Sequence, residues 1–512
     1  MLLNSLLENV HRHPEKAAVC DERMTLSYGQ LAAVAAYVAR LIQGRTQQAR
    51  VGIMLPACAA FAPVFFGTRW AHRTAVPLNF LLQPSDLQEI VKDAGFDLLI
   101  TIRHFEKLAT ALPCGPVYID DELARLARLK KWLGWLPRFL QPRQPPVPRF
   151  EPDELAALLY TSGTSGQPKG VMLSEKNLSS NARECIERAR MDPDGAFLSC
   201  LPKFHSFGLT ALLLAPMMVG ATGHFHPRFN ASAVAKTIRD LRITVFMAVP
   251  SMWNAMLRLK SVPADNFSSL KLAISGGEGL PVTVRDGYRE RFNLDILEGY
   301  GLTETSPVVA LNLPWANKPG TVGKPLASWQ CRIIPDHGDQ REISDHVPSL
   351  EALSPAPPGE IGELWLKGPC LTSGYLNKPE LTRQAFSADG WFRTGDYCSI
   401  DSDGYLAIRG RKKEMLIIAG ENVFPAEIEQ VLAQHPAVAQ VAVVGAMDPI
   451  RGETPIAFVV PQEDAELSAA DLRDFARDRL AAYKLPGKYV IEADLPKGPT
   501  GKLLKRELRS RL

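Results

Sequence analysis

The sequence lacks the features that mark several classes of protein. None of its apolar runs reaches the ~18 residues that span a bilayer. The best candidate, 207–219, is interrupted by Pro216 and predicts a buried helix. The chain does not start with a basic segment and a cleavage site, so we expect no secretory signal. The eight cysteines include no Cys-x-x-Cys pair and no metal-ligand spacing, which favours reduced thiols in a cytoplasmic protein.

The net charge and the composition exclude fewer classes of protein than these missing features do. A formal net charge of +3 on 512 residues gives no indication of a nucleic-acid partner, and we expect none. Hydrophobic residues make up 46% and charged residues 22% of the chain, as is usual for globular proteins. A chain of this length can form about two to four domains with substantial cores.

Apolar strands alternate with helical segments along most of the chain. Strands are predicted at 51–55, 98–101, 196–201, 245–250 and 270–275. Strands that are separated by helices pair in parallel, and the helices then cover both faces of the sheet. The pattern therefore predicts an α/β fold with parallel sheets.

The last part of the chain has a different texture. After Gly359 strands dominate, and the region after Arg411 has the order β-α-β-β-α. The predicted elements are strands at 361–367, 405–408, 415–418, 438–444 and 455–460, and helices at 425–435 and 469–480. We place a boundary at 410–412, which gives a large N-terminal domain, 1–410, and a small α+β C-terminal domain, 411–512.

One loop concentrates hydroxyls and glycines around a single lysine: Tyr160-Thr-Ser-Gly-Thr-Ser-Gly-Gln-Pro-Lys-Gly170. An apolar strand, 155–159, leads into it, and 171–173 leads out to a helix predicted to begin at Ser174. Such a loop can direct backbone N–H groups, hydroxyls and the Lys169 ammonium toward a polyphosphate. A flexible linker is the alternative, but linkers rarely lie between short apolar strands within a domain.

This loop differs from the P-loop of GTPases and kinases. The P-loop has a glycine, four residues, and then Gly-Lys-Ser/Thr. Here Gly163 and Gly166 are too close together, and Pro168 precedes Lys169. The spacing therefore excludes a P-loop nucleotide site.

Five further motifs each have a structural explanation when they are taken alone. They are 201–208 with His205, the glycine turn 274–280, 297–305 with Thr303 and Glu304, 391–396 with Asp396 and the later Gly410-Arg411 pair, and 495–502 with Lys502. A hydroxyl next to a carboxylate can hold Mg²⁺ and a phosphoryl oxygen together. An aspartate with an arginine suits a ribose diol, and a lysine on a Gly/Pro turn suits a phosphate.

Together and in this order, the motifs resemble those of the adenylate-forming superfamily, which includes acyl-CoA synthetases, firefly luciferase and the adenylation domains of peptide synthetases. The resemblance runs from about residue 5 to the C-terminus. It implies a large N-terminal α/β domain of parallel-rich sheets with a β-barrel-like part, and a small, mobile α+β C-terminal domain. It also implies two half-reactions. A carboxylate attacks the α-phosphate of ATP to give an acyl-adenylate and pyrophosphate, and a thiol then displaces AMP.

The resemblance implies a role for each motif residue. Thr161, Ser162, Gly163, Thr164, Ser165 and Lys169 would bind the β- and γ-phosphates, and Thr164 and Glu304 would hold Mg²⁺. Gly277, Glu278, Gly299 and Tyr300 would surround the adenine, and Asp396 and Arg411 would bind the ribose. Three catalytic roles fall to Thr303 at the α-phosphate or the substrate carboxylate, His205 at the carboxylate end of the acyl pocket, and Lys502 between carboxylate and α-phosphate.

The acyl pocket is expected after His205 and around 250–253, and the stretch 207–214 carries no charge. Relatives that activate amino acids place an aspartate in this region, and an unpaired buried ammonium would be costly. An apolar acid is therefore favoured. The stretch 297–323 is similar to medium- and long-chain fatty-acid activators and to bacterial acyl-acyl-carrier-protein synthetases, which predicts a role in fatty acid metabolism.

The sequence leaves two candidates for the thiol that accepts the acyl group. The segment 420–429 matches the family surface that lines the thiol tunnel, which favours a thioester product. CoA is the expected co-substrate, and the phosphopantetheine of an acyl carrier protein is the alternative. A non-catalytic relative that binds nucleotide or lipid is a third interpretation, which the presence of Glu304, Asp396 and Lys502 disfavours. The family hinge follows the arginine of the Gly-Arg pair, but Arg411-Lys-Lys-Glu414 does not identify one pivot residue.

A basic, aromatic segment, 123–140, has leucines at helical spacing and is followed by a Pro-rich stretch, 141–148. Two interpretations are open. The segment is either a surface helix that contacts lipid head groups at the inner face of the membrane, or a helix that packs its leucines on the domain.

Overall fold

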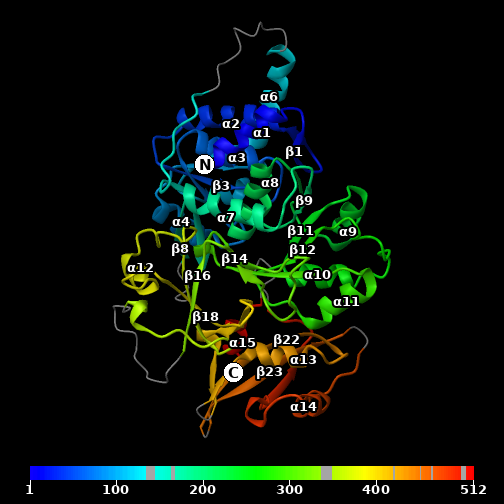
Figure 1. The fold of residues 1–512 in the computed structure, drawn as a ribbon. Coiled ribbons are helices and arrows are strands. Elements are labelled where there is room, and N and C mark those ends of the chain that lie inside the picture. The colour runs from blue at the N-terminus through cyan, green and yellow to red at the C-terminus, as the bar shows by residue number, and fades with distance from the viewer. Residues whose placement is uncertain are drawn as a thin grey trace.

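The computed structural model describes residues 1–133, 145–162, 168–335, 349–418, 421–449, 451–462, 465–496 and 503–512. Within these residues the strands form four sheets. The two larger sheets and their helices fill the upper and middle parts of the molecule in Figure 1, and the last sheet lies at the bottom.

The largest sheet has nine strands in the described part of the chain, and its centre is parallel, as predicted. In spatial order the strands are β15 Lys324–Pro325, β14 Val308–Leu311, β13 Leu297–Gly301, β12 Leu272–Ser275, β11 Val245–Ala248, β9 Ala196–Ser199, β10 Thr222–Phe225, β1 Ala17–Cys20 and β2 Thr25–Ser27. The strands from β13 to β1 pair in parallel, and antiparallel strands close both edges. The carboxyl ends of β12 and β13 therefore lie side by side.

A second sheet has six strands in the described part of the chain, and the two strands that flank residues 163–167 lie at one end of its order. Its order is β6 Gly115–Tyr118, β5 Leu98–Thr101, β3 Arg50–Met54, β4 Thr74–Pro77, β7 Leu155–Ser162 and β8 Pro168–Ser174. The strands from β6 to β7 are parallel, whereas β7 and β8 form an antiparallel hairpin. Strands therefore flank residues 163–167 on both sides, as predicted, while 163–167 themselves lie outside the described residues.

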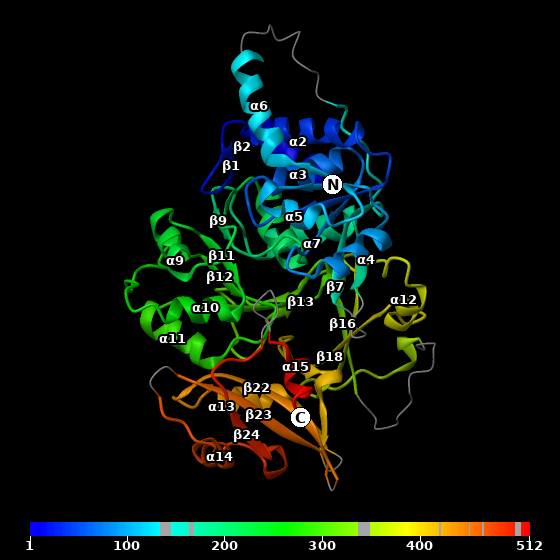
Figure 2. The ribbon, with the colours of Figure 1, turned by 180° about the vertical axis from the view of Figure 1, so that it is seen from behind.

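The helices cover these sheets. Their bounds are α1 Leu2–Arg12, α2 Tyr28–Gln43, α3 Phe61–Trp70, α4 Pro84–Ala94, α5 Glu106–Ala109, α6 Ile119–Leu133, α7 Glu175–Arg188, α8 Ala215–Val219, α9 Ala231–Asp240, α10 Pro250–Leu257 and α11 Val282–Phe292. Ser174 caps α7, since its side chain accepts from Asn177 N and the Asn177 side chain accepts from Ser174 N. The predicted start of this helix is therefore confirmed. Figure 2 shows α9, α10 and α11 grouped beside β11 and β12.

A third sheet includes the region after Gly359 in which the sequence predicts that strands dominate. Its antiparallel strands are β16 Gln330–Ile334, β17 Gly362–Lys367, β18 Phe392–Ile400 and β19 Leu406–Arg411, with α12 Pro379–Ala385 between β17 and β18. The periodicity did not reveal β18, because its centre, Arg393-Thr-Gly-Asp396, is polar. This strand places Asp396 directly opposite Arg411.

The last sheet is small and mixed. Its strands are β20 Leu416–Ile418, β21 Glu421–Val423, β22 Val438–Asp448, β23 Gly452–Pro461 and β24 Lys488–Ile491, and its helices are α13 Pro425–Leu432, α14 Ala469–Arg477 and α15 Lys505–Arg509. The predicted β-α-β-β-α order is present, and β21, β24 and α15 are additions to it. Leu508 of α15 packs with Ala442 and Val444 of β22. The boundary at 410–412 and the mobility of this domain stay predictions.

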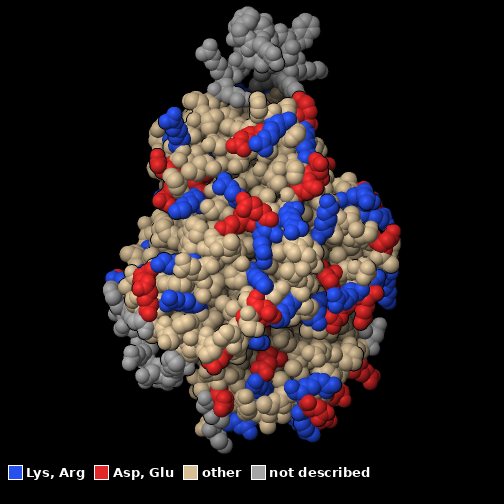
Figure 3. All heavy atoms as spheres, in the orientation of Figure 1, with Lys and Arg blue, Asp and Glu red and all other residues tan. Residues whose placement is uncertain are grey.

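Two predictions concern membranes. The run 207–219 forms a π-helical segment, Phe207–Leu214, followed by α8, and it is almost wholly buried, as expected. Among the described residues no helix is long and apolar enough to cross a membrane. The basic segment is helical to Leu133 in α6, but 134–140 lies outside the described residues, so its lipid contact stays a prediction. On the face in Figure 3, basic and acidic side chains are interspersed.

Candidate active site

A cavity of about 2300 Å³ lies where the sheets meet. Residues from both large sheets line it, and so do Lys413 and Leu504 from the region after Arg411. Of the residues predicted for the site, the lining includes Thr161, Lys169, His205, Gly277, Glu278, Gly299, Tyr300, Thr303, Glu304 and Arg411. The fold thus gathers residues that are dispersed over most of the sequence.

The β7–β8 hairpin brings Thr161 and Lys169 to one edge of this cavity. The two residues are direct partners in the hairpin register. Thr161 Oγ1 is buried, and in the described part of the structure it has no hydrogen-bond partner. A buried hydroxyl of this kind is suited to a ligand. The predicted residues Gly163, Thr164 and Ser165, and the side chain of Ser162, lie outside the described residues.

Lys169, Glu304 and Tyr375 form a closed triangle of polar contacts. Lys169 Nζ lies 3.3 Å from Glu304 Oε1 and donates to the Tyr375 hydroxyl at 2.9 Å. The Tyr375 hydroxyl donates in turn to Glu304 Oε1 at 2.8 Å. Burial and the neighbouring Glu304 carboxylate raise the pKa of Tyr375, so the phenol stays protonated. No sequence motif singled out Tyr375.

Glu304 fits a magnesium ion that is shared with a nucleotide. Within the described residues, no group of three or more His, Cys, Asp or Glu side chains could hold a metal ion. Mg²⁺ does not need such a group, because it retains waters and takes one or two carboxylates plus substrate phosphates. Glu304 beside Lys169 provides a carboxylate next to a phosphate-binding cation.

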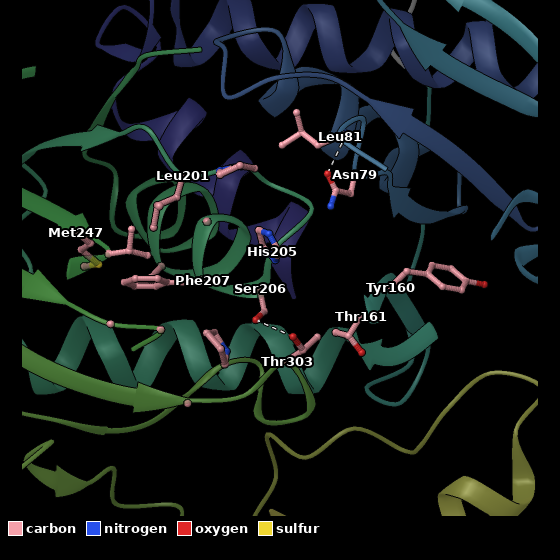
Figure 4. Close-up of a pocket in the computed structure, with 18 of the residues that line it drawn as sticks. Asn79, Leu81, Tyr160, Thr161, Leu201, His205, Ser206, Phe207, Met247 and Thr303 are labelled. Carbon is pink, nitrogen blue, oxygen red and sulfur yellow. Dashed lines mark hydrogen bonds between the residues drawn. The ribbon is translucent and has the colours of Figure 1, made fainter. Parts of the chain in front are cut away.

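Thr303 and His205 both line the cavity. Ser206 Oγ donates to Thr303 Oγ1 at 3.5 Å, which links the start of the π-helical segment to the turn after β13 (Figure 4). His205 precedes this segment, and its ring lies 4.7 Å from that of Phe204. The predicted catalytic residues Thr303 and His205 therefore lie on adjoining segments, whereas Lys502 lies outside the described residues.

The glycine turn after β12 forms a flat wall. A Cβ at Gly276 would come within 3.3 Å of the Phe207 ring. Gly277 has a φ of +90°, which side-chain-bearing residues rarely adopt. Bare backbone at these two positions leaves a slot beside Gly299 and Tyr300 that suits a planar base.

Tyr300, Asp396 and Arg411 form a second polar cluster. The Tyr300 hydroxyl donates to Asp396 Oδ2 at 2.5 Å, and Arg411 Nε lies 3.2 Å from Asp396 Oδ1. The Asp396 side chain is only 4% exposed, whereas Tyr300 and Arg411 line the cavity. Burial and the adjacent carboxylate raise the pKa of Tyr300 well above its usual range. Asp396 therefore holds both cavity-facing groups in place.

The inner wall of the cavity is apolar. Cys185, Met191, Ala211, Met247 and Leu311 contribute to the lining, and all five are buried. In the view of Figure 4, Phe207 and Met247 lie to the left of His205 and Ser206. This wall suits an uncharged chain or ring.

Lys203 is a buried cation that sequence reasoning missed. Its Nζ donates to Ser199 Oγ and, at 3.0 Å, to Leu201 O, and its side chain is fully buried. Burial lowers the pKa of Lys203 to about 7. Its contacts fix the turn that leads to His205, which gives it a structural role.

This lysine predicts a pH-dependent stability. Between about pH 7 and pH 10 the unfolded chain binds this proton more strongly than the folded protein, so the free energy of unfolding rises with pH, by up to about 1.4 kcal/mol per unit. Lys203→Met should remove that slope. The measurement is urea unfolding of both proteins from about pH 7 to pH 8, compared as the difference between the two curves, so that the cysteine thiols, whose usual pKa is about 8.5, contribute equally to both. Parallel curves for the two proteins would contradict the account.

Comparison with known proteins agrees with this geometry. Residues 6–376 match the family described as AMP-binding enzyme, and residues 427–502 match the AMP-binding enzyme C-terminal domain. The chain is 31% identical to the long-chain-fatty-acid–CoA ligase of Bacillus subtilis, covering 99% of this chain and 94% of that protein. It is 32% identical to a fatty acid–[acyl-carrier-protein] ligase of Streptomyces coeruleorubidus, covering 99% and 96%.

A solved structure extends the comparison to three dimensions. The o-succinylbenzoate coenzyme A synthetase of Bacillus subtilis, in complex with ATP and magnesium ion, has a TM-score of 0.82 and 28% identity over 99% of both chains. The predicted fold is confirmed by this likeness and by the four sheets described above. The chain belongs to the AMP-binding enzyme family, the adenylate-forming enzymes whose motifs its sequence carries.

Proposed function

We propose that this protein is an AMP-forming acid–thiol ligase that activates a medium- or long-chain fatty acid with ATP and transfers the acyl group to CoA. The observation that carries the proposal is that one cavity is lined both by Lys169, Glu304, Tyr300 and Arg411 and by a set of buried apolar side chains. A polyphosphate nucleotide and an apolar acid can meet in such a space. Family membership supports the same reaction class.

The first half-reaction joins the acid to AMP. A carboxylate oxygen of the acid attacks the α-phosphorus, and the bond from that phosphorus to the bridging oxygen of pyrophosphate breaks. We assign the β- and γ-phosphates to Lys169 and to residues 161–165, the base to the slot at Gly277, Glu278, Gly299 and Tyr300, and the ribose to the Asp396–Arg411 pair. Glu304, with Thr164, would hold Mg²⁺, which supplies positive charge to the phosphates.

In the second half-reaction a thiol sulfur attacks the acyl carbon, the bond from that carbon to the phosphate oxygen breaks, and AMP leaves as the thiol loses its proton. We place Thr303 and His205 beside the reacting carboxylate, because both line the cavity and lie on adjoining segments. Lys502 is assigned to the first half-reaction. It directly precedes Leu503, and Leu504 lines the cavity.

The acid is proposed to be apolar because of the inner wall. The relatives act on different acids by name, a long-chain fatty acid in one and o-succinylbenzoate in another, so family membership alone does not choose among them. The buried lining at Met191, Ala211, Met247 and Leu311 offers no charged partner for a second carboxylate or an ammonium. An uncharged acyl chain is the substrate that this wall fits.

Ala211→Phe tests the direction of the acyl pocket. The added ring would fill space next to the π-helical segment, so kcat/KM for C16 acids should fall by about tenfold or more, as one or two methylenes already change binding in apolar pockets. A C6 acid, which does not reach the filled space, is the internal control and should lose less than about threefold. Equal losses for both acids would mean that the acyl chain of the substrate does not extend past residue 211.

Two alternatives to a CoA ligase remain to be tested. One has a different acceptor, and the other is a protein without catalytic activity. Transfer to the phosphopantetheine of an acyl carrier protein is supported by the similarity to a carrier-protein ligase. A non-catalytic nucleotide- or lipid-binding role is disfavoured, because Glu304, Asp396 and Lys502 are all present.

One assay separates these possibilities. Pyrophosphate release is measured with acids from C6 to C18, first with CoA and then with a holo acyl carrier protein. The proposal predicts turnover that depends on the acid and is faster with CoA. Faster turnover with the carrier protein would favour the alternative acceptor, and no turnover with any acid would refute the ligase.

A further inference from the structure

Tyr375 joins three segments that are distant in the sequence. Its backbone lies against β8, where Tyr375 and Val171 form an antiparallel bridge and Leu376 N donates to Gly170 O at 2.8 Å. Its hydroxyl contacts Lys169 at the end of the hairpin and Glu304 after β13. The side chain is almost fully buried yet lines the cavity.

The backbone of Tyr375 contributes to the local fold, whereas its hydroxyl contacts side chains of the site. The bridge to β8 and the bond from Tyr375 N to Thr382 Oγ1 fix the strand edge, and they do not depend on the hydroxyl. The ring supports Lys169, whose Nζ lies 4.1 Å from the ring centroid. Among the described residues the hydroxyl adds two contacts, to Lys169 and to Glu304, so its removal changes the site without changing the strand edge.

We propose that the Tyr375 hydroxyl is a positioning group for the metal-binding carboxylate. This inference rests on the proposed function, in which Glu304 holds Mg²⁺. By donating to Oε1, Tyr375 fixes the rotation of the Glu304 carboxylate, which lines the cavity, and does not engage Oε2. By accepting from Lys169, it keeps that ammonium beside the carboxylate until phosphates compete for it.

Tyr375→Phe isolates the hydroxyl, because it retains the ring and the backbone. The test is calorimetric binding of α,β-methylene-ATP, which cannot release pyrophosphate, with Mg²⁺ and with EDTA, together with binding of AMP. Loss of a hydrogen bond to a charged group predicts about tenfold or more weaker binding with Mg²⁺. Binding in EDTA and binding of AMP should change less than about twofold, because neither involves the metal.

A matched control and a double variant sharpen the test. Tyr405 also lies beside lysines, and its hydroxyl contacts only the backbone at Ala316 O among the described partners, so Tyr405→Phe should leave all three affinities unchanged. In a Glu304→Gln background, Tyr375→Phe should have little further effect on binding with Mg²⁺.

The outcomes separate the inference from the proposed function. If the wild-type protein binds the analogue equally well with Mg²⁺ and with EDTA, the proposed metal site itself fails. If the wild-type protein shows metal dependence but Tyr375→Phe weakens AMP as much as the Mg²⁺ complex, or weakens neither, the positioning role is overturned.

Discussion

Lys502→Ala is expected to lower the rate of acyl-adenylate formation by about 100- to 1000-fold, the usual effect of removing one preorganised contact to developing charge. The second half-reaction should persist, so that a synthetic acyl-adenylate still reacts with CoA. The structural basis is the position of the described residues on either side of 497–502. The described chain leaves at Pro496, returns at Leu503, and is closed by a 2.8 Å bond from Leu504 N to Pro496 O at the edge of the cavity.

The measurement is single-turnover formation of acyl-adenylate, alongside thioester formation from added acyl-adenylate. Lys505→Ala is the matched control. Lys505 is also a lysine near the C-terminus, but it pairs with Glu429 at 2.7 Å and with Glu414, and it is absent from the described cavity lining. It should affect stability more than rate. Loss of both half-reactions in Lys502→Ala would refute a role confined to the first.

Asp396→Ala is expected to weaken nucleotide binding by about 100-fold, since it removes charge-assisted hydrogen bonds and releases two cavity-facing groups. Tyr300 loses its acceptor, and Arg411 loses the carboxylate that orients it. The free energy of unfolding should also fall by about 2 kcal/mol, because the Tyr300 hydroxyl loses a hydrogen bond to a charged acceptor. The partial exposure of Arg411 limits the electrostatic share of that loss.

These effects are measured by titration with AMP and by urea unfolding. Asp403→Ala provides the control. Asp403 lies in the turn between β18, which holds Asp396, and β19, which holds Arg411. Its carboxylate forms an exposed pair with Lys318 at 3.2 Å. Exposed pairs contribute less than about 1 kcal/mol, so this variant should bind AMP normally. Comparable losses in both variants would indicate that the turn is sensitive in general and that Asp396 has no special role.

The parts of the fold that the sequence predicts are those with local signals. Apolar runs at 98–101 and 245–250 mark buried parallel strands, and the capping residue Ser174 marks the start of α7. Neither depends on distant residues, so periodicity and capping chemistry suffice. Strand β18 was missed because its polar centre, which carries Asp396, breaks the apolar pattern that identifies a strand.

The site residues also fall into those that local motifs predict and those that they do not. Glu304 and Lys169 are predictable because each belongs to a motif with fixed chemistry along the chain. Tyr375 is not, because its meaning comes from pairing with β8 and from contacts to two remote residues. Lys203 is hidden for another reason. A lysine next to Phe204 and His205 gives no sign that the fold buries it completely.

We propose above all that the protein makes an acyl-adenylate in the cavity that Thr161 and Lys169 line. The most direct measurement is exchange of labelled pyrophosphate into ATP without any thiol. The account predicts exchange that requires Mg²⁺ and a fatty acid, that is strongly reduced in Lys502→Ala, and that does not require CoA. Exchange that is independent of the acid, or no exchange with any acid, would contradict it.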